Sequence, residues 1–592
     1  MVSLPQHIED TALSRLFIGP KRSPEVAWFS LPGGRVLFHA GEEPDKLYFL
    51  LAGRLGVVRR DEGQEPQFLG VIRPGEPAGE MAMIAGTTHT ATVVALRDSE
   101  LMALPRSAFL GISQRDPTVM AELAHLMIVR ARHTAGATSE PAVFGFTSLC
   151  PSASVRSLVD ALESEILRLG YTVAAAGAEV QSAPTEWFSN LEEQHDFVLY
   201  AAEYDQPGWR AIVGRQVDRL FFVGAGAEQP PPDVRSYASP PLLEQQLADL
   251  ILLHRPGATA PTGSGVWMDA TPASRLFHMR QGDPQDVARL ARTLIGQSVG
   301  LVLSGGGARA YAHIGVIRAL HEASVPIDFV GGTSMGGIIA AGVAMGWSDE
   351  ELDWRIRKAF VDTSPLSDIA LPLIAMTRGE KVRHRLAEHF GDVKIPDLWL
   401  PFFCVSSDLT SGVYHLHKRG LLRQALRASI ALPGILPPVS DGGHVLVDGA
   451  VTKNFPTDIM RSVHLGPTIG VDVAEARGLT AEDIETPASI WKWLLSGAWR
   501  QGPPIVSVLI RSATISTAHE AAAAREYTDL LVVPDIGPVE IQDWKAYDVA
   551  VEAGYRAAAE ILEKLDHPVT ELRRRATLAE RRATQTFIAA PR

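Results

Sequence analysis

The chain has 592 residues, which is more than one hydrophobic core usually organises, so we expect several domains. Hydrophobic residues make up 46% of it and charged residues 21%, as in globular proteins, and no apolar run approaches the ~20 residues that a membrane-spanning helix needs. The formal net charge of −13 repels the phosphates of nucleic acids, which argues against a nucleic-acid partner.

The first predicted domain covers residues 1–135. Its start, MVSLPQHIEDTALSRLF, lacks the basic residues and the apolar run of a secretory signal. The two cysteines, Cys150 and Cys404, make no disulfide framework, so cytoplasmic residence is the default expectation. Residues 26–105 hold short alternating apolar runs between glycines, a pattern typical of a small antiparallel β-roll. Apolar residues then recur at intervals of three and four over residues 115–133, which predicts a closing helix.

A small α/β domain is predicted over residues 140–265. The strand-like segments PAVFGFTSL, YTVAAAG, DFVLYAA and DRLFFVGAG follow or precede the helical segment VRSLVDALESEILRLG. Such alternation favours a parallel sheet. The stretch from Glu228 to about Gly265 is rich in Pro and Gly, and we expect it to be loop and linker around one helix.

The third predicted domain, residues 290–565, opens with a βαβ unit. Apolar strands at 299–303 and 327–330 are separated by one helix and followed by a second. Because a parallel crossover brings the turns after both strands to the same end of the sheet, we expect Gly305-Gly306-Gly307 and Ser334 to lie side by side.

Ser334 lies in the segment Gly332-Thr333-Ser334-Met335-Gly336, which has the G-x-S-x-G pattern of a nucleophile elbow. In such an elbow the serine stands at a strained turn, and the glycines let strand and helix approach closely. The preceding three-glycine turn offers backbone N–H groups at a helix N-terminus, as a developing oxyanion requires. The alternatives are a helix start capped by a serine and a dinucleotide-binding turn, although the acidic residue of the latter is missing.

A base for this serine is a further requirement, and Asp448 in SDGGHVLVDGAVTKNFP is the clearest candidate. It follows a short apolar strand and precedes a glycine, so the turn of a β-hairpin is the alternative interpretation. A triad would instead place a histidine after the acid, where the chain offers His464, His519 and His567. None of the three lies in a recognisable motif.

Together these motifs resemble the patatin-like phospholipases, and the flanking residues and the N-terminal roll resemble the neuropathy-target-esterase branch of that family. The family marks are a G-G-G-x-R/K turn, a G-x-S-x-G elbow and a D-G-A/G aspartate, found here at residues 305–309, 332–336 and 448–450. The resemblance implies a dyad of nucleophile Ser334 and base Asp448 without a histidine. It also implies hydrolysis of phospholipid or lysophospholipid acyl esters, with no metal or cofactor needed for catalysis.

The same resemblance assigns supporting roles around the dyad. Gly305, Gly306 and Gly307 would form the oxyanion hole, and Gly332 and Gly336 would support the elbow. Arg309 directly follows the glycine turn, and it would either orient that turn or meet a phosphate head group.

The N-terminal roll resembles a cyclic nucleotide-binding domain, with Gly79 and Glu80 opening the phosphate-binding segment. In that family the glutamate holds the ribose hydroxyl, and an arginine about nine residues later grips the cyclic phosphate. Here His89 stands at that position, and a neutral histidine offers one donor where an arginine offers a charged fork. We therefore expect a regulatory cyclic nucleotide to bind weakly or not at all, and to bind more tightly as the pH falls through about 6.5 if His89 contacts the phosphate.

The sequence thus predicts a multidomain chain with an N-terminal β-roll with helices, a small middle α/β domain, a C-terminal α/β patatin-like domain with a mostly parallel sheet, and a basic tail at 566–592. The predicted function is a serine lipid acyl hydrolase with peripheral membrane contact, with a homo-oligomer left open. The alternative is a signalling or docking protein whose hydrolase domain is silent. Residues 364–379, SPLSDIALPLIAMTRG, are a candidate for the membrane contact, although buried packing is the commoner role of an apolar run.

Overall fold

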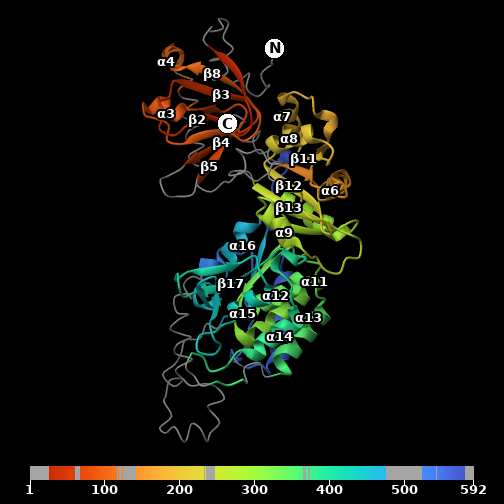
Figure 1. Cartoon of the computed structure of the whole chain (residues 1–592). Helices are drawn as coiled ribbons and strands as arrows, with labels where there is room; N and C mark the ends of the chain where they lie inside the picture. Colours follow the sequence, from red (N-terminus) through yellow and green to blue (C-terminus); the bar gives the residue numbers. More distant parts are fainter. Residues whose placement is uncertain are drawn as a thin grey trace, which may run out of the picture. The chain divides into compact units, whose positions relative to one another are not determined.

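The computed structural model describes residues 26–59, 67–115, 118, 120, 123, 142–232, 234, 247–363, 368–370, 374–474, 523–541 and 543–580. The chain divides into two compact units, and each is described by itself (Figure 1). Unit 1 comprises Met1–Ile251, Asp269–Ser274 and Ala576–Arg592, and unit 2 comprises Leu252–Met268 and Arg275–Arg575. Most of the helix predicted over residues 115–133, and residues 581–592 of the predicted tail, lie outside the described residues.

Unit 1 begins with the predicted β-roll, which has two antiparallel sheets of order β1-β8-β3-β6 and β2-β7-β4-β5. Along β3, Leu47 and Phe49 belong to one hydrophobic cluster and Leu50 to another, as the alternation of side chains along a strand requires. The elements are β1 (Ala27–Leu31), β2 (Val36–Phe38), β3 (Lys46–Ala52), β4 (Leu55–Arg59), β5 (Gln67–Ile72), β6 (Pro77–Ala78), α3 (Glu80–Ala85), β7 (Thr92–Ala95), β8 (Ser99–Pro105) and α4 (Arg106–Arg115).

The second part of unit 1 is the predicted small α/β layer, in which β10, β11, β9 and β12 pair in parallel in that order. The layer contains β9 (Val143–Ser148), α6 (Val155–Arg168), β10 (Val173–Ala176), η1 (Ala178–Val180), α7 (Thr185–Gln194), β11 (Phe197–Ala202), α8 (Pro207–Gln216) and β12 (Arg219–Ala225). The roll contacts this layer through buried charges. Arg97, which is 1% exposed, donates to Asp218 at 2.7 Å and also pairs with Glu192, and Arg54 pairs with the same Asp218.

One expectation for this region is wrong. Instead of loop and linker around one helix, the chain forms the strand β13 (Leu247–His254), which crosses the boundary between the two units. Ile251 and Leu252 in its middle are fully buried. A short apolar run has no polar face, so its periodicity cannot separate a buried strand from a loop-flanked helix.

Unit 2 is built on a mostly parallel sheet, as predicted, with the order β19-β20-β17-β16-β15-β21-β22 and with β18 also paired to β17. Up to the second helix of the βαβ unit, the elements are α9 (Ser264–Ala270), β14 (Arg275–Arg280), α10 (Pro284–Ile295), β15 (Gly300–Leu303), η3 (Gly307–Tyr311), α11 (Ala312–Glu322), β16 (Phe329–Thr333) and α12 (Ser334–Met345).

The remainder of unit 2 adds helices on the sheet and the antiparallel strands β18 to β20. Its elements are α13 (Asp349–Ile356), the π-helical turn η4 (Arg357–Val361), α14 (Glu380–Phe390), η5 (Ile395–Asp397), β17 (Phe402–Asp408), β18 (Tyr414–His417), α15 (Leu422–Ser429), β19 (Val439–Asp441), β20 (His444–Asp448), η6 (Gly449–Val451), α16 (Thr457–Val463), β21 (Thr468–Val471), β22 (Leu530–Val532), α19 (Tyr547–Glu563) and η9 (Val569–Glu571).

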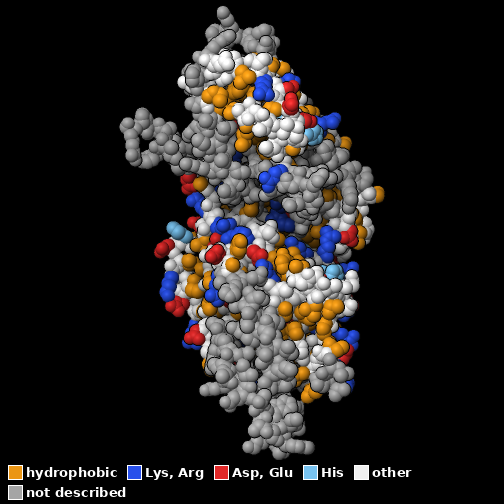
Figure 2. Space-filling model, turned by 90° about the vertical axis from the view of Figure 1, so that its left-hand side faces the viewer, with side chains coloured by type: hydrophobic (Ala, Val, Ile, Leu, Met, Phe, Trp, Pro, Cys, Tyr) orange, Lys and Arg blue, Asp and Glu red, His pale blue; other side chains and the backbone are white. Residues whose placement is uncertain are grey.

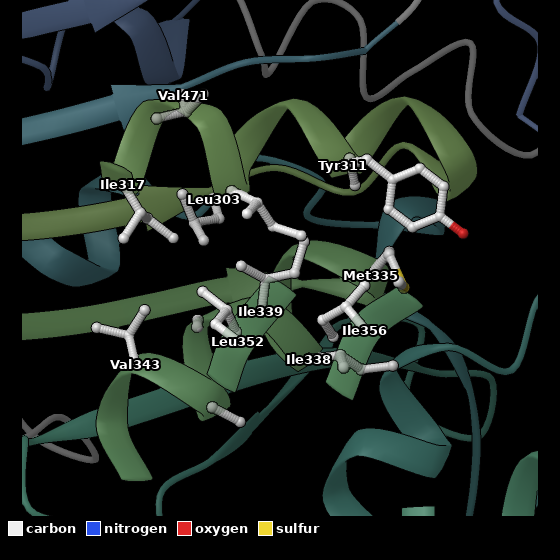
Figure 3. Close-up of a cluster of buried hydrophobic side chains, with 14 of the residues drawn as sticks. Leu303, Tyr311, Ile317, Met335, Ile338, Ile339, Val343, Leu352, Ile356 and Val471 are labelled. Atoms are coloured by element: carbon white, nitrogen blue, oxygen red, sulfur yellow. The ribbon is translucent and has the colours of Figure 1, made fainter. Parts of the chain in front are cut away.

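The core of unit 2 lies between the parallel strands and the helices beside them. Leu303 from β15, Ile317 from α11, Ile339 from α12 and Leu352 from α13 point into one cluster (Figure 3). Helix α12 is buried over most of its length, because it packs on both β16 and β17. The helix that starts at Ser334 is therefore held firmly against the sheet.

Two strands of unit 2 meet end to end. Thr333 at the end of β16 pairs with Val405 of β17, and Asp448 at the end of β20 pairs with the next residue, Ser406. Strand β18 pairs with residues 404–407 of β17, a stretch that overlaps the pairing of both β16 and β20, so neither of them can lie on that side. Strands β16 and β20 therefore share the other side and run toward each other, which brings residues 334 and 448 together.

Candidate active site

Ser334 begins α12 directly after β16, in the sharp turn that its motif predicts. Its φ of 55° lies in the left-handed region, which non-glycine residues rarely adopt, so the backbone here is strained. A Cβ at Gly332 would lie 2.6 Å from the carbonyl oxygen of Leu303, and one at Gly336 would collide with the carbonyl oxygen of Ser304. Glycine at both positions thus permits the close packing of strand, turn and helix.

The hydroxyl of Ser334 does not cap its helix. Instead Ser334 Oγ donates a hydrogen bond to Asp448 Oδ2 at 2.6 Å. Asp448 is 2% exposed, whereas Ser334 is partly exposed. The structure thus brings together the two residues that the sequence singled out as nucleophile and base.

Burial controls the protonation of Asp448. It raises the pKa of the carboxyl group from 3.8 to about 6, although hydrogen bonds from Ser334 and from the backbone N–H of Ala450 oppose the shift. The hairpin interpretation of this Asp-Gly pair is wrong, because Asp448 ends β20 and leads into the short helix η6. The hairpin turn lies earlier, at Gly442 and Gly443, which both have positive φ.

Ser429, at the end of α15, is a neighbour of the site that the sequence did not indicate. Its Oγ accepts a hydrogen bond from the backbone N–H of Ser334 at 2.9 Å and donates one to the carbonyl oxygen of Val405 at 2.6 Å. It is fully buried, so this link ties the strained turn to β17. A single serine in an ordinary helical segment carries no motif, and only the tertiary structure reveals this contact.

The three-glycine turn lies beside Ser334, as expected from the βαβ crossover. A Cβ at Gly305 would be 3.0 Å from Ser334 Cβ. Gly307 has a φ of 56°, and a side chain there would collide with the backbone of Ile541. The two backbone donors directly after Gly305, the N–H groups of Gly306 and Gly307, have no recorded hydrogen-bond acceptor among the described residues.

Asn454 is a second neighbour that the sequence did not single out. Its side-chain Nδ2 donates to the carbonyl oxygen of Gly305 at 3.3 Å, and its backbone carbonyl oxygen accepts from the N–H of Gly305 at 3.4 Å. This reciprocal pair fixes the first residue of the glycine turn.

Arg309 donates to backbone carbonyl groups that follow β21 and β22. Its Nε donates to the carbonyl oxygen of Val473 and its Nη1 to that of Val539, each at 2.9 Å. The side chain is 9% exposed. Of the two roles that the sequence suggested, these contacts favour orientation of the turn over contact with a head group.

Of the histidines suggested for a triad, His464 lies away from the candidate site. His464 packs against Gly300 at the start of β15, the opposite end of the strand from the glycine turn, and burial lowers its pKa to about 3. His567 follows α19 and is exposed, whereas His519 lies outside the described residues. In the part of the chain that the structure describes, no group of His, Cys, Asp and Glu side chains is arranged to hold a metal ion.

In the roll, Gly79 has a φ of 87° and precedes α3, and a Cβ there would lie 3.3 Å from the ring of His89. Glu80 is buried. The ring of His89 is 6% exposed and stacks on Phe38 with 3.8 Å between centroids. Burial lowers the pKa of His89 below 6.5, although Glu42 and Asp45 oppose the shift. The pH window expected from the sequence for protonating this ring is therefore too high.

Comparison with known proteins agrees with this division. The family model described as "Patatin-like phospholipase" matches residues 301–461, and that described as "Cyclic nucleotide-binding domain" matches residues 28–116. An uncharacterised NTE family protein of Mycobacterium tuberculosis is 31% identical over 576 residues, which cover 94% of this chain and 94% of that protein.

Animal proteins match the chain over part of their own length. Patatin-like phospholipase domain-containing protein 6 of Mus musculus is 28% identical over 90% of this chain and 44% of that protein. Neuropathy target esterase sws of Drosophila melanogaster is 28% identical over 89% of this chain and 42% of that protein. The predicted resemblance is confirmed: the chain belongs to the NTE family, and its third domain is a lipid hydrolase of the patatin-like phospholipase type.

Proposed function

We propose that the chain hydrolyses the acyl esters of phospholipids or lysophospholipids with Ser334 as nucleophile and Asp448 as base. The observation that carries this proposal is the 2.6 Å hydrogen bond between Ser334 Oγ and Asp448 Oδ2 at a strained turn with φ of 55°. A base with a pKa of about 6 is largely ionised at neutral pH and is still basic enough to accept a proton.

In the first half of the reaction, Ser334 Oγ attacks the ester carbonyl carbon while its proton passes to Asp448 Oδ2. The carbonyl double bond becomes a C–O⁻ bond, and the tetrahedral intermediate then expels the alcohol oxygen. That oxygen takes the proton from Asp448, so the alcohol or lysophospholipid leaves and the acyl group stays on Ser334.

In the second half, water attacks the acyl carbon and gives a proton to Asp448. The new intermediate breaks its bond to Ser334 Oγ, which regains the proton, and the fatty acid leaves. The N–H groups of Gly306 and Gly307 follow Gly305, which lies next to Ser334, and they are proposed to stabilise the oxyanion in both halves. No metal or cofactor enters this scheme.

The roll has a different proposed behaviour. With His89 buried against Phe38 and neutral near pH 7, the phosphate-binding segment offers no permanent cation at that position. We therefore propose that a cyclic nucleotide binds this roll weakly or not at all and is not required for hydrolysis.

A lipid substrate also requires contact with a membrane, which we propose to be peripheral. Among the described residues, no helix is both long and apolar enough to cross a bilayer.

Release of fatty acid from phospholipid and lysophospholipid by the full-length chain and by Ser334→Ala tests the hydrolase. We expect release by the wild type, loss in the variant, and labelling of Ser334 by a fluorophosphonate. A wild-type chain that neither releases fatty acid nor is labelled would instead favour a docking protein with a silent domain.

A further inference from the structure

Five large aliphatic side chains are exposed on three short segments of unit 2. Ile369 and Ile374 are 60% and 74% exposed, and they belong to the segment that the sequence suggested for a membrane contact. Leu409 and Val413 are each 57% exposed, and Val445 is 41% exposed. On the face shown in Figure 2, hydrophobic side chains likewise reach the surface in groups between charged ones. Exposed aliphatic groups of this size are most informative where they gather near a site.

Leu409, Val413 and Val445 lie together at the start of β20, the strand that carries Asp448 at its end. The N–H of Leu409 donates to the carbonyl oxygen of Val445, and the N–H of Asp408 donates to that of Val413. Val445 precedes Asp448 by three residues of β20, so it lies roughly 10 Å farther out along the strand direction than the dyad. These three residues therefore extend outward from the dyad along the strand direction, with Val445 on the face of β20 opposite to Asp448.

Ile369 and Ile374 reach the same region through a second set of contacts. Ile369 bridges to Thr377, and Ala375 and Met376 pair with Gly434. Gly434 belongs to the loop after α15, whose residue Ala431 accepts the backbone hydrogen bond of Asp448. In contrast with the exposed isoleucines, Ala375 and Thr377 are buried, so this segment packs with one side and leaves the other uncovered.

Charge on these segments is balanced or turned inward. Asp368 caps α14 by accepting from the N–H groups of Glu380 and Lys381. Asp408 accepts from Thr410, Ser411 and His444 and is 3% exposed. Arg378 and Asp441 are exposed and opposite in sign. A partner surface would consequently be recognised by apolar insertion and not by net charge.

We propose that Ile369, Ile374, Leu409, Val413 and Val445 form a docking surface that inserts into a neutral phospholipid bilayer and holds the site over its substrate. This inference rests on the proposed function for its choice of occupant, because a site that takes an acyl ester from a bilayer needs apolar contacts at its rim. The surface corrects the sequence-based preference for a buried role of residues 364–379 at two described positions, Ile369 and Ile374.

Flotation with phosphatidylcholine vesicles tests the surface on the full chain. We compare the wild type, Ile374→Glu/Leu409→Glu, the milder Ile374→Ser/Leu409→Ser, and Tyr527→Glu as a control. Tyr527 is 46% exposed and precedes β22, at the opposite end of the parallel strands from Ser334. Thermal melting checks that each variant is folded. Hydrolysis of vesicle lipid and of a soluble short-chain ester are measured in parallel.

We expect vesicle binding and vesicle hydrolysis to fall about tenfold for each large aliphatic anchor replaced by Glu, whereas the soluble ester is turned over as by the wild type. The serine variant should lie between, and high salt should change binding little. Unchanged flotation of the glutamate variant overturns the surface, as does binding that salt abolishes. Loss of flotation in the glutamate variant supports the docking surface whether or not the chain hydrolyses either ester. Absence of hydrolysis by the wild type would overturn only the proposed function. If the glutamate variant changes its oligomeric state but not its flotation, the surface mediates contact between copies of the chain. The proposed insertion into a bilayer would then be wrong.

Discussion

The end of the sheet in unit 2 and the phosphate-binding turn of the roll carry motifs that were identified in the same way, yet their geometries differ. At the sheet, Ser334 at the start of α12 and Asp448 at the end of β20 are far apart in sequence, yet Ser334 Oγ lies 2.6 Å from Asp448 Oδ2. In the roll, His89 turns inward onto Phe38. Matching residues in a motif therefore indicate a fold in both regions, but only at the sheet are the side chains arranged for chemistry.

The physical reason for the difference lies in the surroundings of the two buried ionisable side chains, Asp448 and His89. Asp448 is buried with a hydrogen-bond donor on each side, so its charge is costly but directed at Ser334. His89 is buried against an aromatic ring, which favours its neutral form. Burial thus prepares a base in one region and removes a cation in the other.

The largest expected effect concerns the dyad. Asp448→Asn and Ser334→Ala should each lower kcat/KM by at least ~10³-fold, and the double variant should be little worse than either, because nucleophile and base act as a unit. Steady-state kinetics on a soluble ester, with circular dichroism to check folding, measures this. An Asp448→Asn protein that keeps most of its activity would contradict the dyad, because the buried carboxylate would then have no chemical role. The contrast with the roll would then be lost as well.

Histidine variants serve as controls for the dyad. Replacement of His464, His519 or His567 by Gln should leave turnover largely intact, although His464 is buried and its replacement also needs a stability control. If any one of these variants lost as much turnover as Ser334→Ala, a catalytic triad with that histidine would replace the dyad.

The second prediction concerns the glycine turn. A Cβ at Gly306 would lie 2.7 Å from Val473 Cγ2, so Gly306→Ala must shift the turn, although its φ of −176° suits any residue. We expect kcat to fall about 10²-fold with little change in KM, because donors to an oxyanion act mainly in the transition state. Gly265→Ala, with no atom within 4 Å of its Cβ, is the matched control. A raised KM with unchanged kcat would mean that the turn holds the substrate instead.

The third prediction concerns the pH dependence of hydrolysis, which reports on the protonation of Asp448. Burial raises the pKa of Asp448 to about 6, and a general base acts only when it is deprotonated. We therefore expect kcat/KM to rise about tenfold per pH unit below pH 6 and to level off above it. A pH–rate profile on the soluble ester measures the midpoint. A midpoint near 4 would mean that burial does not control this carboxyl group.

The smallest effect is expected in the roll. His89→Arg restores a permanent cation, and we expect cAMP or cGMP to bind roughly tenfold more tightly than to the wild type, with turnover of the soluble ester unchanged. Because burial lowers the pKa of His89, any tightening of weak wild-type binding on acidification should set in below pH 6.5, so titrations at pH 8 and at several pH values below 6.5 are compared. Calorimetric titration measures both.

His39→Arg, which adds the same charge at an exposed position of the roll, is the control for non-specific attraction. Tight wild-type binding would show that another group holds the phosphate and would remove the contrast between the two regions. An absence of binding even in His89→Arg would assign the roll to docking.

Patterns in the sequence predicted the fold class, the roll and the mostly parallel sheet of the third domain, because glycines at tight turns and apolar runs along strands are local requirements of the backbone. The pairing of Ser334 with Asp448 was implied only by the family resemblance, since the residues alone left a hairpin turn and a triad open. The same local patterns misread the strand Leu247–His254, since a fully buried run has no polar face to mark its period.

Tertiary structure alone decided which residues surround these candidates. Ser429 and Asn454 come from elements distant in sequence, and they reach Ser334 and Gly305 only because β16 and β20 meet along one side of β17. The raised pKa of Asp448 and the lowered pKa of His89 likewise depend on burial by residues from other elements. Local sequence specifies turns and strands, whereas the desolvation and contacts that tune a side chain exist only after the chain has packed.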